Sequence, residues 1–174
     1  MFTQLLAKSP AKRAGERLYH DAARQGRTTA LYTEMGAPDT VDGRFELLTL
    51  HVILLVDRLK EAASSAADVR QSLFDAYLSN LDGALREMGV GDLAVGKRMR
   101  KLGEAFYGRA QAFEAAFSAL PDETPLRDVL TRTVLQTSET APAALASYVV
   151  ACREALLTCA LSDILRDGPI WGVA

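Results

Sequence analysis

Between residues 95 and 117, apolar side chains recur every three or four residues, in steps of 4, 3, 4, 4, 3 and 4. This is the period of one face of an α-helix, sustained over about six turns. The pattern is the most regular in the chain, and it predicts a long helix that buries its apolar face against other elements. The members of the face are Val95, Met99, Leu102, Phe106, Ala110, Phe113 and Phe117.

Helical periodicity extends over most of the remaining chain, and we find no convincing strict alternation bounded by hairpin signals. Ser9-Pro10 predicts the start of a first helix, because Ser caps and Pro fits the first helical position, and Gly26 predicts its end. Asp39 or Thr40 is expected to cap a second long helix that is apolar nearly all round and therefore central.

Further start and stop signals follow downstream. Ser65 and Asp68 resemble a capping box, and Gly89 is expected to end the helix they open by adopting the left-handed conformation. A last helix is expected from Thr140 to about residue 166, before Gly168 terminates it.

The fold class predicted from these signals is an all-α, single-domain bundle of six or seven helices over residues 1–174, with residues 1–35 as a candidate appended N-terminal helical layer. A chain of 174 residues that is 49% apolar can bury one sizeable core without disulfides or metals. The cysteines at 152 and 159 are about 10 Å apart along a helix, too far for a disulfide, and we interpret them as core residues.

No uninterrupted apolar run exceeds five residues, whereas a bilayer span needs about 20. The N-terminus also lacks the pattern of a secretory signal. We therefore expect a cytoplasmic protein, with peripheral attachment to the inner membrane left open.

The net charge of −2 conceals an uneven distribution. Residues 97–110 carry five basic groups and one acidic group, and four of the basic groups fall within Lys97-Arg98-Met99-Arg100-Lys101. Three interpretations remain open for this run: a solvated helix face, a docking surface for an acidic partner or lipid headgroups, and a nucleic-acid site. The acidic chain lacks the broad basic field and stacking aromatics of nucleic-acid binders, so we expect no specific nucleic acid.

The sequence gives little support for a catalytic, metal-binding or cofactor-binding site. The two histidines, His20 and His51, lie 31 residues apart without paired cysteines, which is no recognisable zinc site. His51 falls within an apolar stripe and is interpreted as a hydrogen-bonded core residue, with haem ligation as the alternative. No nucleotide motif is present, and we expect no enzyme activity, no metal and no cofactor.

Several segments together resemble the ubiquinol–cytochrome c chaperone family, over roughly residues 15–165. The segments are PDTVDGRFELL at 38–48, LFDAY at 73–77, LREMGVGDLAV at 85–95, KRM at 97–99 and AFYGR at 105–109. The resemblance, to a bacterial homologue of the mitochondrial cytochrome b assembly chaperone, implies a helical assembly factor for the ubiquinol:cytochrome c reductase complex.

The family's mitochondrial members associate with newly made cytochrome b, act with a small partner protein and dock at the ribosomal tunnel exit. The resemblance therefore implies an energy-independent chaperone whose client is cytochrome b, an integral membrane protein, with the membrane surface, the ribosome and a small partner protein as further contacts. Two alternatives stay open: a ribosome- or RNA-docking adaptor that uses the basic surface, and a haem carrier that uses His51.

Candidate contact residues for a client or partner come from the same segments. Phe45 and Phe106 lie on core stripes, so packing is the favoured interpretation for both, whereas Tyr107 lies off the 95–117 stripe and has a polar end suited to an interface. The full candidate set is Arg44, Phe45, Arg98, Lys101, Phe106, Tyr107 and Arg109.

Overall fold

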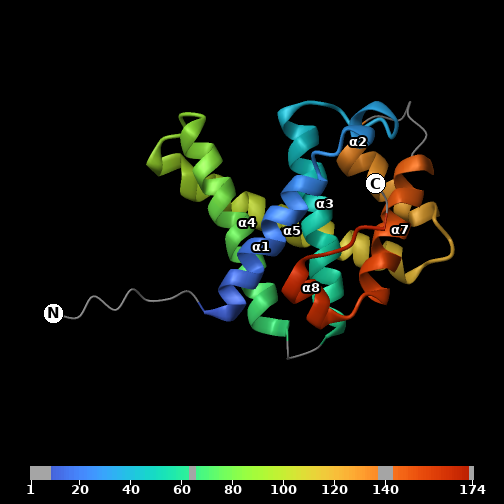
Figure 1. The fold of residues 1–174 in the computed structure, drawn as a ribbon. Helices are drawn as coiled ribbons and strands as arrows, with labels where there is room; N and C mark the ends of the chain where they lie inside the picture. Colours follow the sequence, from blue (N-terminus) through green and yellow to red (C-terminus); the bar gives the residue numbers. More distant parts are fainter. Residues whose placement is uncertain (1–8, 63–65, 137–142, 173–174) are drawn as a thin grey trace.

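The structure, a computed structural model, describes residues 9–62, 66–136 and 143–172, and within these ranges its regular secondary structure is all helical, without strands. The all-α prediction is confirmed (Figure 1). The elements are α1 (Pro10–Gln25), α2 (Thr29–Thr33), α3 (Val41–Glu61), α4 (Ala67–Glu87), α5 (Asp92–Ser118), α6 (Thr124–Leu130), the π-helical turn η2 (Thr131–Leu135), α7 (Ala143–Thr158) and α8 (Leu161–Asp167).

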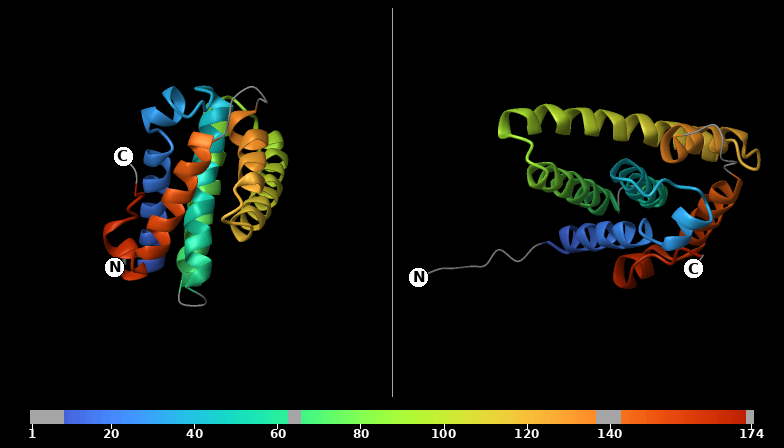
Figure 2. Two further views of the ribbon diagram at one scale, coloured as in Figure 1. Left: turned by 90° about the vertical axis from the view of Figure 1, so that its right-hand side faces the viewer. Right: turned by 90° about the horizontal axis from the view of Figure 1, so that it is seen from above.

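Helix α3 is the centre of the bundle. Seen end-on in Figure 2, it lies between α5 on one side and α1 on the other, and α7 also packs against it. This position matches a sequence that is apolar nearly all round, because every face of the helix meets a partner. The buried apolar side chains of α3 are Leu47, Leu50, Val52, Ile53, Leu54, Leu55 and Leu59.

The predicted limits of the first two long helices are confirmed. Ser9 caps α1, its hydroxyl accepting a hydrogen bond from the Lys12 N–H at 3.2 Å, and Gly26 follows the last residue. Of the two proposed caps for α3, Thr40 is the one used, and its hydroxyl accepts from the Gly43 N–H at 3.1 Å. These bonds satisfy backbone donors that a helix start leaves unpaired.

Helices α4 and α5 form a long hairpin that extends beyond the neighbouring helices (Figure 1). Gly89, between them, has a φ of 82°, so the predicted left-handed turn is confirmed. The capping box at Ser65 lies outside the described residues. Val69 and Leu73 of α4 are buried, but Met88 at its far end is 60% exposed. The apolar face of α4 therefore leaves the core before the helix ends.

The single last helix predicted from the sequence is wrong: α7 and α8 are separate helices, bent by 103° at their junction. Arg58 of α3 donates to the Leu156 carbonyl at 2.7 Å and to the Cys159 carbonyl at 3.1 Å. This arginine satisfies carbonyl groups at the end of α7, which lets the chain turn there. The proposed start at Thr140 lies outside the described residues.

In the described ranges, no single helix has the length and apolar character to cross a membrane, although α7 and α8 taken together meet that criterion.

His51 of α3 is fully buried beneath the C-terminal tail. Its Nδ1 lies 2.7 Å from the Leu47 carbonyl oxygen and its Nε2 lies 2.7 Å from the hydroxyl of Tyr148, while the Trp171 ring packs edge-on at 5.1 Å. Nδ1–H donates to the carbonyl, so Nε2 accepts from the tyrosine and the imidazole is neutral. The prediction of a hydrogen-bonded core histidine is confirmed. Cys152 and Cys159 are both free thiols, as expected.

Burial lowers the pKa of His51 to about 4. The unfolded chain, with a pKa of about 6.5, takes up its proton first, so the stabilising contribution is complete above pH 6.5 and is lost as the pH falls towards 4. We predict that His51 accounts for about 3 kcal/mol of acid destabilisation over this interval.

Urea unfolding of the native protein and of His51→Gln at pH 7, 6, 5 and 4 measures this contribution. The difference in unfolding free energy between the two proteins should shrink as the pH falls. His20→Gln, at an exposed site, should follow the native protein at each pH. A difference between native protein and His51→Gln that is constant with pH contradicts the prediction.

Candidate functional site

An apolar groove with a volume of about 670 Å³ opens beside the end of the α4–α5 hairpin that carries the turn. Four helices contribute side chains to it, and its apolar lining comes mainly from the second half of α4 and the first half of α3. We call it the hairpin groove. Its apolar side chains are Tyr19, Ala23, Val41, Phe45, Leu48, Leu81, Ala84, Leu85, Met88 and Leu102.

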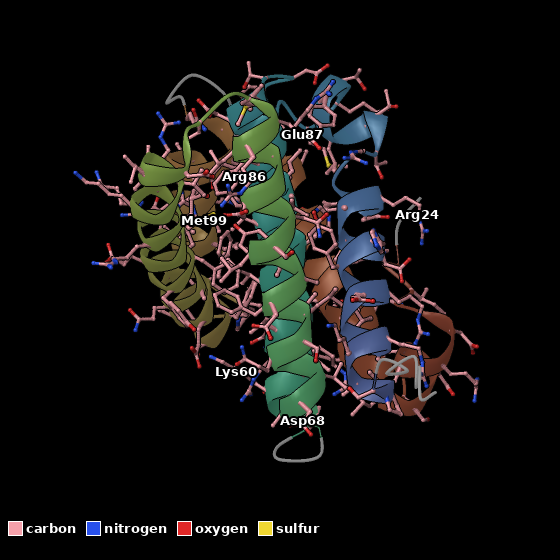
Figure 3. All side chains as sticks on the ribbon, turned by 90° about the vertical axis from the view of Figure 1, so that its left-hand side faces the viewer. Arg24, Lys60, Asp68, Arg86, Glu87 and Met99 are labelled. Carbon is pink, nitrogen blue, oxygen red and sulfur yellow. The ribbon has the colours of Figure 1, made fainter. Side chains whose placement is uncertain are left out.

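The course of α1 explains why the groove is open. An added Cβ at Gly15 would lie 2.5 Å from the backbone nitrogen of Leu73 in α4, whereas one at Gly26 would lie 3.3 Å from the backbone nitrogen of Leu48 in α3. Helix α1 therefore meets α4 closely near its own start and rests on α3 at its end. The second half of α4 is therefore not fully covered by α1. Figure 3 shows α4 between α5 and α1, with Arg86 and Glu87 near this end.

Side chains at the mouth of the groove are apolar and exposed. Val41 is 71% exposed and Met88 is 60% exposed, while Leu81 and Leu85 are half-buried deeper along the same wall. Contiguous exposed apolar side chains with a polar rim are typical of sites that bind proteins or membranes. The arrangement fits the apolar face of an amphipathic or membrane helix.

A buried ion pair supports the wall of the groove. Glu46 is buried, and Arg109 of α5 donates to both of its carboxylate oxygens, from Nε at 2.8 Å and from Nη2. The guanidinium lies 5.9 Å from the centroid of the Phe45 ring and also donates to the Ala105 carbonyl at 3.2 Å. Because the two charges cancel and most of their hydrogen bonds are made internally, this part of the wall presents no free charge.

The rim of the groove carries charge of both signs. Arg27, Asp42 and Arg44 line its edge. Arg44 is exposed and donates to Asp39 at 2.7 Å, and this hydrogen bond lowers the pKa of the Asp39 carboxyl below its ordinary value. Charged rims orient a partner more than they add affinity.

The structure brings together only part of the candidate set derived from the sequence. Arg44 and Phe45 line the groove, and Arg109 supports it through Glu46. Arg98 and Lys101 are exposed on α5 and do not line it.

Phe106 and Tyr107 belong to an aromatic cluster on another side of the hairpin. Phe106 is buried, 5.0 Å from the Phe74 ring and 5.2 Å from the Tyr77 ring, so it is a packing residue and not a surface contact. This corrects its place among the candidate contacts, because it lies on the buried face of α5. Tyr107 is 59% exposed and rests on Phe74 at 5.5 Å.

Sequence reasoning missed three residues of α4 that line the groove. Leu81, Leu85 and Met88 continue the apolar face of α4, and this continuity made them resemble core residues. The sequence signal that distinguishes Met88 from a core residue is its position directly before the Gly89 turn, where a helix end has few neighbours. Only the path of α1 reveals that Leu81 and Leu85 stay half-buried in the wall of a groove.

Nothing in the described part of the chain gathers three or more side chains able to hold a metal ion. The geometry of His51 bears on the haem alternative, because both ring nitrogens are engaged and the side chain is enclosed. Ligation of haem by His51 requires the Tyr148 hydrogen bond to break and the tail to move.

The ion pair beneath the groove yields a stability prediction. Arg109→Ala leaves the Glu46 carboxylate buried and unpaired, and we expect the free energy of unfolding to fall by about 2 kcal/mol. Arg98→Ala, on the exposed surface of the same helix, should change it by less than about 0.5 kcal/mol. Urea unfolding at neutral pH measures both, and equal effects of the two substitutions contradict the role assigned to the pair.

Comparison with known proteins places the fold in a family. The crystal structure of the Cbp3 homologue from Brucella abortus matches with a TM-score of 0.82 and 33% sequence identity, covering 95% of this chain and 91% of that one. A search of curated proteins found no significant match. The family described as ubiquinol-cytochrome C chaperone matches residues 33–171, which include the second half of α4, α5 and most of the hairpin groove. The chain belongs to the ubiquinol-cytochrome c chaperone family.

Proposed function

We propose that this protein is an energy-independent, non-enzymatic chaperone that holds apolar segments of newly made cytochrome b in the hairpin groove during assembly of the ubiquinol:cytochrome c reductase complex. Membership of the chaperone family supports the general role. The observation that carries the proposal of a binding site is the open apolar groove, lined by four helices and rimmed by charge.

The physical need for such a site follows from the client. Membrane helices expose apolar surface to water until they meet lipid or their neighbouring helices, and that surface drives aggregation. Side chains such as Leu81, Leu85 and Met88 offer a substitute apolar contact. The interaction is the insertion of an apolar helix face into a groove.

The size of the groove limits what it holds. Its volume of about 670 Å³ lies within the range of roughly 300–1,000 Å³ found for ligand pockets. The groove therefore accommodates a few side chains on one face of a helix and not a whole membrane span. Such a limited contact permits release when cytochrome b gains its permanent neighbours, because no energy source is needed if a better partner competes.

The site of action is part of the proposal. A chaperone for an integral membrane client acts where that client enters the membrane, so we propose action in the cytoplasm, peripheral to the inner membrane. The ribosome and a small partner protein stay predictions from the family resemblance.

Substitutions at the mouth of the groove test the proposal. Val41→Asp and Met88→Asp place a charge where an apolar client segment would bind, and each should reduce capture of cytochrome b by about fivefold or more. Because both side chains are exposed, the free energy of unfolding should stay within about 0.5 kcal/mol of the native value. Affinity capture of the tagged protein from membranes of respiring cells measures the first effect, and urea unfolding measures the second.

Ile170→Asp is the matched control, because Ile170 is 67% exposed and lies outside the groove. Its capture of cytochrome b should equal that of the native protein. If Val41→Asp, Met88→Asp and Ile170→Asp all reduce capture of cytochrome b equally, the groove is not a selective site. Capture of every apolar membrane protein in proportion to its abundance argues against it in the same way.

Tyr107 is tested separately, because it lies outside the groove but stays a proposed contact for the client or a partner. Tyr107→Ala removes an exposed ring that rests on Phe74, and the free energy of unfolding should fall by no more than about 1 kcal/mol. Weaker capture of cytochrome b or loss of a co-purifying protein is expected. A large stability loss with unchanged capture removes Tyr107 from the set of contacts.

A further inference from the structure

The exposed face at the start of α5 carries four cations that have no ionic partner within the described residues. Lys97, Arg98, Arg100 and Lys101 are all exposed, and no described carboxylate lies within ion-pair distance of any of them. Arg86, in contrast, is exposed on the adjoining end of α4 and pairs with both Asp82 and Asp92. The unpaired charge is therefore concentrated on α5.

A fully exposed leucine stands at the end of the same face. Leu93, Lys97 and Lys101 follow one another at intervals of four residues, which places them along one line of the helix, with Arg100 beside them. No described residue covers Leu93, which is fully exposed. The line covers about 12 Å of helix from Leu93 to Lys101. We call this line, together with Arg100, the outer face of α5.

One flank of this face is also open. An added Cβ at Gly96 or Gly103 would meet no atom within 4 Å, so no other part of the described chain covers this side of α5. The basic stretch of this face ends at Glu104, an exposed carboxylate four residues after Arg100.

We propose that the outer face of α5 lies on an anionic lipid surface, with Leu93 at the headgroup boundary and Lys97, Arg100 and Lys101 near the lipid phosphates. An interface of this kind combines basic side chains with an apolar residue that enters the boundary region. Long basic side chains keep their charged ends at the phosphates while their stems lie over apolar surface.

Lipid fits this combination better than nucleic acid or an acidic protein surface. A single-stranded nucleic-acid site needs aromatic side chains among the cations, and the exposed aromatic residue described on the hairpin, Tyr107, lies beyond Glu104. Neither a phosphate backbone nor a carboxylate patch offers an apolar medium to Leu93, whereas a bilayer does. The hairpin that carries this face also forms one wall of the groove, so the groove would lie close to the membrane surface.

Sedimentation with vesicles tests the proposal on the full chain and in the absence of any client. Native protein should bind vesicles of phosphatidylcholine mixed with roughly 30% phosphatidylglycerol, and should bind much less to pure phosphatidylcholine or at high salt. Lys97→Gln combined with Lys101→Gln should weaken binding by about 25-fold, at roughly fivefold for each charge near the surface. Leu93→Ser should weaken binding at least about threefold and leave its salt dependence unchanged.

The matched control combines Arg70→Gln with Arg132→Gln, which removes the same charge from elsewhere on the molecule. Its binding should stay within about twofold of the native value. The proposal is overturned if the native protein fails to bind the anionic vesicles. It is also overturned if the control loses as much vesicle binding as the variant with both Lys97→Gln and Lys101→Gln. Binding of single-stranded RNA through Lys97 and Lys101, without vesicle binding, assigns the face to nucleic acid and equally overturns it. The assay contains no cytochrome b, so its outcome is independent of the proposed client.

Discussion

Burial of the middle of α3 on all sides is the constraint on which the structure depends. Most of its leucines, with Val52 and Ile53, fill the space between α1, α5 and α7, and the buried polar side chains of α3 each have a hydrogen-bond partner. The Thr49 hydroxyl donates to the Phe45 carbonyl at 2.8 Å and contacts the Tyr77 hydroxyl at 2.9 Å, while His51 joins α3 to α7 through Tyr148. Burial raises the pKa of Tyr77 to about 12, so its hydroxyl stays protonated and able to donate. These bonds fix the positions of the helices around α3.

The same arrangement produces the groove. Helix α1 cannot cover all of α4 because its close contacts lie with α4 at Gly15 and with α3 at Gly26. The uncovered end of α4 retains an apolar face, and the hairpin places that face beside the exposed start of α3. The Glu46–Arg109 pair then joins α3 to α5 beneath the opening without adding a net charge. The apolar groove and the core around α3 thus have one structural origin.

Local signals were sufficient to predict the helices whose ends are set by nearby residues. Ser9, Gly26, Thr40 and Gly89 act through their own backbone or side-chain bonds, so they can be recognised without the fold. The break between α7 and α8 was missed because it depends on Arg58, about 100 positions earlier. The α4 wall of the groove was missed for a related reason. The apolar pattern of α4 is the same whether a residue is covered, as Leu73 is, or left open, as Leu85 is, and only tertiary packing separates the two.

Contact between the hairpin groove and cytochrome b is the central claim, and site-specific photo-crosslinking in respiring cells tests it most directly. A photoreactive amino acid at position 85, within the groove, should form a covalent adduct with newly made cytochrome b. The same group at position 157, at the partly exposed Leu157 of α7 outside the groove, should not. Adducts with cytochrome b from position 157 but not from position 85 contradict the account.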